Sequence, residues 1–179
     1  MPIRSNMKTV QYNDIRDKIE DGDIVLFDPP YTWKRPFDAI IKLVTGSPFT
    51  HTNIAFWCDY GAGRRLMAIE AQGGTKRRII NMSYYNGLNM VVFKGIKPWA
   101  EIAPNALSKV AEQRYSYLTA IYAGIRDFFI NHFGIKLPKL QHPGEICSEF
   151  VASEIGLSDT DISPGDLYKV LSGITTERS

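Results

Sequence analysis

Apolar residues in the first half of the chain follow the two patterns that are typical of β-strands. Residues 24–27 form a continuous apolar run of strand length, which predicts a strand covered on both faces. Residues 51–58 and 66–72 alternate instead, and a polar, glycine-containing turn joins them, which predicts a hairpin of an antiparallel sheet. Two more strands are predicted at 78–82 and 90–93.

The alternation also assigns side chains to the two faces of the predicted hairpin. One face of its first strand carries His51, Asn53, Ala55 and Trp57, and one face of its second strand carries Leu66, Ala68, Glu70 and Gln72. Glu70 stands within an otherwise apolar run. Because a buried carboxylate is costly unless it is paired, the pattern predicts a polar partner for Glu70.

The second half of the chain changes to helical spacing of apolar residues. Helices are predicted at 14–20, 36–44, 100–114, 117–129 and 145–155, and a last short helix opens at Ser163–Asp166. Gly156 is a suitable C-terminal stop for the helix at 145–155. Strands followed by helices predict an α+β fold. We expect a single domain over 1–179, with a polar N-terminal extension at about 1–13.

Composition narrows the class of protein further. The 179 residues are 44% hydrophobic and 22% charged with a formal net charge of +2, which gives no reason to expect a nucleic-acid partner. The charged run 76–78 is expected to be a solvated strand end or turn rather than a binding patch. The first residues lack an apolar signal core, and no apolar run approaches the ~20 residues of a transmembrane helix. We therefore expect no transmembrane segment and a cytoplasmic location, unless another route exports the protein or places it in a particle.

The two cysteines, Cys58 and Cys147, are too few for a disulfide framework or a paired-cysteine metal motif. Cys147 falls in the first turn of the helix predicted at 145–155. The positive end of a helix dipole lowers a thiol pKa from ~8.5 towards neutrality, and unpaired amides of the first turn can line an oxyanion hole. A lone cysteine is otherwise most often a small buried side chain. Its position makes Cys147 a candidate nucleophile.

A thiolate needs a base, and the chain has three histidines. His132 ends an apolar helix, where a histidine commonly has a structural role. His142 lies in a loop close to Cys147 in sequence and is kept as an alternative base. His51 begins a predicted strand, where a side chain can be held rigidly against a facing helix. A third polar group would orient the imidazole, and Glu70 is the first candidate, with Gln72 and then Asn53 as weaker ones.

Four short motifs in this order resemble a known family. Residues 22–27 (GDIVLF), 50–55 (THTNIA), 68–71 (AIEA) and 146–151 (ICSEFV) are similar to the circularly permuted branch of the NlpC-type papain-like hydrolases. The resemblance is greatest to the YiiX-like proteins, which are related to the lecithin retinol acyltransferase group. It spans about 21–171 and includes Ser163–Leu167, which is similar to the closing segment of the branch.

The resemblance implies a papain-like fold, with the cysteine on a helix that packs against an antiparallel sheet carrying the histidine. It implies Cys147 as nucleophile, His51 as base and Glu70 as the polar third residue of a catalytic triad. Either Tyr115 or Tyr117 resembles an aromatic residue near the family's active site. The chain lacks the acyltransferase group's second histidine near position 70 and has Ile146 where that group has Asn.

These features predict a thiol hydrolase that cleaves an amide bond through a thioester, with peptides of the cell wall (peptidoglycan fragments) as one substrate class. This chemistry requires no metal and no cofactor. A lipid ester or amide hydrolase, or an acyltransferase, is the alternative enzyme, since Trp33, Phe37 and Phe49 could line an apolar groove, although a place in the core explains these three residues more simply. A non-catalytic binding or structural module is the third interpretation, because fold does not dictate function.

Overall fold

The computed structural model describes residues 9–30, 36–71, 77–110 and 146–178. In chain order its elements are α1 (Tyr12–Ile15), η2 (Arg16–Lys18), β1 (Ile24–Asp28), α2 (Pro36–Thr45), β2 (His51–Tyr60), β3 (Gly63–Ala71), β4 (Arg77–Asn81), η3 (Met82–Tyr85), β5 (Asn89–Phe93), α3 (Trp99–Ser108), α5 (Cys147–Ile155) and α6 (Pro164–Ile174), where η marks a 3₁₀-helix. The α+β prediction is confirmed.

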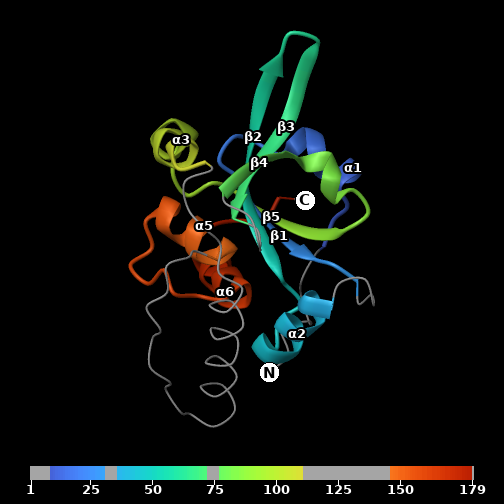
Figure 1. Ribbon diagram of the computed structural model, residues 1–179, viewed down its shortest axis with the longest axis vertical. Helices are drawn as coiled ribbons and strands as arrows, with labels where there is room; N and C mark the ends of the chain where they lie inside the picture. The colour runs from blue at the N-terminus through green and yellow to red at the C-terminus, as the bar shows by residue number, and fades with distance from the viewer. Residues whose placement is uncertain (1–8, 31–35, 72–76, 111–145, 179) are drawn as a thin grey trace.

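The five strands form one antiparallel sheet in the order β4-β3-β2-β1-β5. The predicted hairpin is β2–β3, in which Ile54 lies opposite Ile69. His51, the first residue of β2, lies opposite Phe27 of the neighbouring β1. The His51 end of the hairpin is therefore held inside the sheet, while the turn of the hairpin projects beyond it (Figure 1).

Apolar side chains cover both faces of the sheet, in two separate clusters. Helices α3, α5 and α6 lie on one side of the sheet and α1 lies on the other (Figure 1). Strand β1 contributes side chains to both clusters. Ile24 and Leu26 belong to the cluster beneath α3, α5 and α6, and Val25 and Phe27 belong to the cluster on the α1 side. All four side chains are buried, as the continuous apolar run predicted.

The two faces of the hairpin follow the alternation read from the sequence. Ala55, Leu66 and Ala68 belong to the cluster on the α1 side, which places Glu70 on that side as well. Ile54 and Ile69 belong to the cluster beneath α5. The α1-side cluster also extends into the stretch that was expected to be a polar extension, because Val10 pairs with Met90 and Tyr12 is buried.

The predicted helix at 117–129 and the end of the one at 100–114 lie outside the described residues. Within the described ranges, no helix combines the length and apolar character needed to cross a membrane.

Candidate functional site

Two of the predicted site residues, His51 and Glu70, meet through a hydrogen bond. Their strands are neighbours in the sheet, and both side chains project on the α1 side. His51 Nε2 lies 2.9 Å from Glu70 Oε2, and the His51 side chain is 17% exposed whereas that of Glu70 is fully buried. Because a carboxylate can only accept, Nε2 carries the proton of this bond. That leaves Nδ1 of His51 for a second interaction.

Glu70 accepts from two further donors, Tyr85 and Arg78. The Tyr85 hydroxyl donates to Glu70 Oε2, and Arg78 Nε donates to Oε1 at 2.8 Å. Burial would raise the pKa of Glu70, but the hydrogen bond and positive charge of His51, followed by the bonds from Tyr85 and Arg78, lower that pKa to about 2. Burial and the Glu70 carboxylate raise the pKa of Tyr85, so that its hydroxyl stays a donor. Glu70 is therefore an ionised carboxylate with three partners, as its place in an apolar run predicted.

Cys147 is the first residue of α5 and is 3% exposed. The helix begins here because Ile146 has extended backbone angles and its N–H is taken by Glu149 Oε2 at 3.0 Å. Gly156, in the left-handed region at φ 79°, ends the helix. The Cys147 side chain is thus placed at the positive end of the helix dipole, among backbone N–H groups that have no intrahelical acceptor.

The side chains of His51 and Cys147 interact at the end of the sheet. Burial would lower the pKa of His51, but the electrostatic effect of Cys147 and a hydrogen bond with it, together with the same effects from Glu70, raise that pKa to about 10. Helix α5 packs on the face of the sheet opposite Glu70. His51 is the first residue of its strand, and its side chain interacts with groups from both of these elements.

The segment that leads into β2 is fixed by α6. Ser47 Oγ accepts from the N–H of Phe49 at 3.2 Å, and the N–H of Thr50 donates to the Phe27 carbonyl at 3.1 Å. A Cβ atom at Gly165, near the start of α6, would lie 2.5 Å from Ser47 Cβ, so only glycine allows this approach. The closing segment at 163–167 therefore supports the backbone that positions His51.

The charged run at 76–78 was expected to be solvated, and for Arg77 this is wrong. Arg77 is 2% exposed; its Nη1 donates to Glu154 Oε1 on α5 at 2.9 Å, and its guanidinium lies over the Phe150 ring, 4.5 Å from the centroid. Asn105 of α3 donates to the other oxygen of Glu154 at 2.7 Å. Arg77 points under α5 because it is the cross-strand neighbour of Ala71, whose side chain faces the same cluster.

Asn53, the weakest candidate for orienting the histidine, is buried and donates instead to Met82 Sδ at 3.5 Å. Phe49 is fully buried against Tyr168, which confirms its place in the core and removes it from a lipid-accepting groove. The remaining candidates lie outside the described residues or have undescribed side chains: Gln72, Tyr115, Tyr117, His132, His142, Trp33 and Phe37.

Two partners of the site were not predicted, Arg78 and Tyr85. Arg78 lies directly opposite Glu70 in the β3–β4 ladder, so the strand register would have revealed it. Tyr85 belongs to a 3₁₀-turn, η3, and no sequence spacing links it to Glu70. Its ring also stacks on Phe27, with 4.2 Å between centroids, which holds the hydroxyl in place.

Among the described residues, no group of three or more His, Cys, Asp or Glu side chains is arranged to hold a metal ion. No protein-family model matches the chain, and no curated protein sequence matches it.

Proposed function

We propose that the chain is a cysteine-nucleophile hydrolase that cleaves an amide bond through a thioester. One observation carries this proposal: His51 joins an ionised, buried carboxylate on one side to the Cys147 side chain at a helix N-terminus on the other. Nucleophile, base and orienting group stand on three regular elements, as covalent catalysis requires.

Cys147, His51 and Glu70 each have a defined part in the proposed reaction. The Cys147 thiolate attacks the carbonyl carbon, and the free N–H groups at the start of α5 stabilise the oxyanion. Protonated His51 gives its Nδ1 proton to the leaving amine as the C–N bond breaks, which leaves an acyl-Cys147 thioester. His51 then takes a proton from water, hydroxide attacks the thioester, and the carboxylic acid and the thiolate are released. Glu70 keeps the ring in the orientation that this transfer needs.

The order of these residues supports a circularly permuted papain-like fold for the domain. The histidine strand precedes the cysteine helix, and that helix packs on the histidine strand within an antiparallel sheet. Ser163–Leu167, matched to the closing segment of the YiiX-like branch, supports the strand that carries His51.

The first test uses the second cysteine as an internal control. Cys58 is more exposed than Cys147, so an ordinary pair of thiols would make Cys58 the faster to react with iodoacetamide. At about pH 6 fewer than one in a hundred ordinary thiols are ionised. We expect Cys147 to be labelled faster than Cys58 at that pH, as measured peptide by peptide by mass spectrometry. His51→Gln should remove this difference, and an unchanged rate would contradict the proposal.

The second test addresses the substrate. Peptidoglycan fragments, short peptide amides and short-chain acyl esters are offered to the native chain and to Cys147→Ser. Amide cleavage that is lost in Cys147→Ser supports the proposal, and release of acyl esters alone favours the lipid-directed alternative. If labelling shows no enhanced reactivity and no substrate is turned over, the non-catalytic interpretation is correct.

A further inference from the structure

A concave site lies towards the turn of the β2–β3 hairpin, at the opposite end of the hairpin from His51. It is a pocket of about 310 Å³, lined by nine residues from α1, η2, the β2–β3 turn, β3, β4 and η3. Three of the nine are arginines, Arg16, Arg64 and Arg65, and none is acidic. A pocket of this size can admit a small ligand, and its lining gives it a positive potential.

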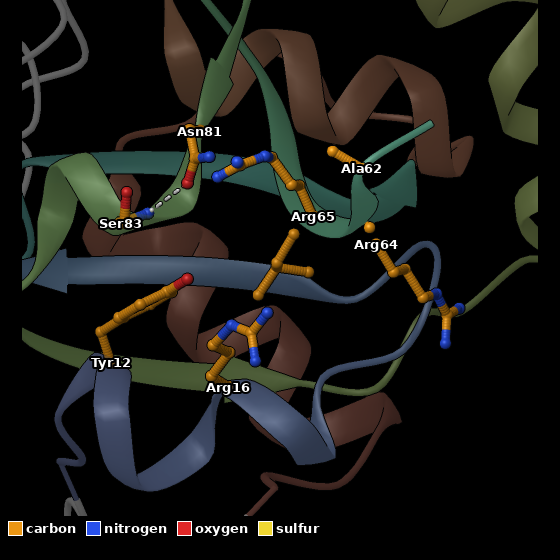
Figure 2. A pocket seen from close by; sticks show the side chains of 9 residues that line it. Tyr12, Arg16, Ala62, Arg64, Arg65, Asn81 and Ser83 are labelled. Carbon is orange, nitrogen blue, oxygen red and sulfur yellow. Dashed lines mark hydrogen bonds between the residues drawn. The ribbon is translucent and has the colours of Figure 1, made fainter. Parts of the chain in front are cut away.

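Two of the arginines are directed at the pocket and the third at its rim. Figure 2 shows the guanidinium groups of Arg16 and Arg65 extending into the space between α1 and β4, whereas Arg64 turns away. The Arg64 guanidinium lies 4.7 Å from the centroid of the Trp57 ring, and that of Arg16 lies 4.9 Å from the same centroid. These contacts with Trp57 hold Arg16 and Arg64 in place.

The two inward arginines, Arg16 and Arg65, differ in whether their guanidinium groups already have hydrogen-bond partners. Arg16 Nη1 donates to Asp17 at 2.8 Å, an ion pair in which Asp17 is almost fully exposed. Arg65 makes no hydrogen bond or ion pair within the ranges of the chain that the structure describes. The planar donor fork of Arg65 is therefore free to bind two oxygens of one anion.

Tyr12 supplies a further hydrogen-bond donor to the pocket. Its side chain is 6% exposed, and its hydroxyl has no hydrogen-bond partner among the described residues. Figure 2 shows that hydroxyl directed into the pocket, towards the side where Asn81 and Ser83 lie. The hydroxyl is not among the buried polar atoms without a partner, so it is accessible from the pocket and can donate to an occupant there.

We propose that this pocket binds a phosphate-type dianion between Arg16 and Arg65, with the Tyr12 hydroxyl as a third donor. Its source is either a free phosphate monoester or the phosphate of a lipid headgroup. The site shares a sheet face with Glu70 and uses none of the residues that surround His51.

Binding is measured by titration calorimetry of the full chain with inorganic phosphate and with glycerol 3-phosphate, at low ionic strength. We expect Arg65→Met to weaken binding about 10- to 100-fold, because it removes charge-assisted hydrogen bonds. Tyr12→Phe keeps the buried ring and should weaken binding about fivefold, as expected for one neutral donor. Lys94→Met removes one exposed positive charge elsewhere and should leave the affinity within about twofold.

The two sources are separated with vesicles. Sedimentation with vesicles containing phosphatidic acid, but not with neutral phosphatidylcholine vesicles, together with sensitivity to Arg65→Met, identifies a lipid headgroup. Saturable binding of glycerol 3-phosphate without vesicle binding identifies a free phosphate monoester. The proposal is overturned if neither probe binds, or if Arg65→Met and Lys94→Met weaken binding equally. Unfolding in urea should be unchanged in Arg65→Met, since the side chain is exposed.

Discussion

Arg77 and Arg78 are consecutive residues of β4, yet they serve the two faces of the sheet in different ways. Arg77 reaches Glu154 in an ion pair whose side chains are each only 1% exposed. Arg78 reaches Glu70, but its own side chain is 35% exposed. The first pair fastens the helix that carries Cys147, and the second fastens the carboxylate that holds His51. The difference shows that a single edge strand can support a site from both faces, with unequal consequences for stability.

The largest expected loss of stability comes from breaking the buried ion pair between Arg77 and Glu154. Arg77→Met leaves Glu154 as a buried carboxylate with Asn105 but without its cation, which should lower the free energy of unfolding by about 3–5 kcal/mol. Urea unfolding followed by circular dichroism measures this loss. The double variant Arg77→Met/Glu154→Leu should recover much of it, because no unpaired charge remains. Equal stability of the single and double variants would contradict a role for the charge.

A smaller loss of stability is expected when Glu70 is replaced, and the size of this loss depends on pH. The pKa of Glu70 is lowered from 4.5 to about 2 in the folded state, so its contribution is complete above pH 4.5 and is lost as pH falls towards 2. Glu70→Gln removes charge-assisted hydrogen bonds and should cost about 2–3 kcal/mol at about pH 6.

The difference between native chain and Glu70→Gln should shrink on acidification, as measured by urea unfolding at about pH 6 and about pH 3. The raised pKa of His51 acts in the opposite sense, because its contribution is complete below pH 6.5 and lost as pH rises through about 10. A difference that stays constant between these two acid conditions would show that Glu70 is not the titrating group.

The smallest effect on stability is expected for Arg78. Because its side chain is about one-third exposed and solvent screens the pair, Arg78→Met should cost at most about 1 kcal/mol. The same substitution removes one donor from Glu70 and so raises its folded-state pKa, which means that the acid-dependent loss of stability should be smaller and should end at a higher pH than in the native chain. If Arg78→Met lowered the free energy of unfolding as much as Arg77→Met does, the proposed difference between the two ion pairs would be wrong.

The sequence predicts the hairpin and its faces well, because the period of two in residues 51–58 and 66–72 is nearly unbroken. The need of Glu70 for a partner followed from the same pattern. Arg77 was misjudged because a run of three cations is usually solvated, and its burial depends on how β4 is paired with β3. Tyr85 could not be found, since its contact with Glu70 is set by the 3₁₀-turn η3 and by stacking on Phe27.

The close approach of Gly165 to Ser47 has a consequence for how the protein is made. On the ribosome, the hairpin carrying the histidine and the glutamate is synthesised long before the cysteine, and the glycine that braces the histidine strand follows later still. Contacts between such distant parts of a chain form late in folding. In a nascent chain the hairpin is therefore present before the parts that contact it, and the Cys147 side chain meets His51 only after α5 and α6 have been synthesised and have docked.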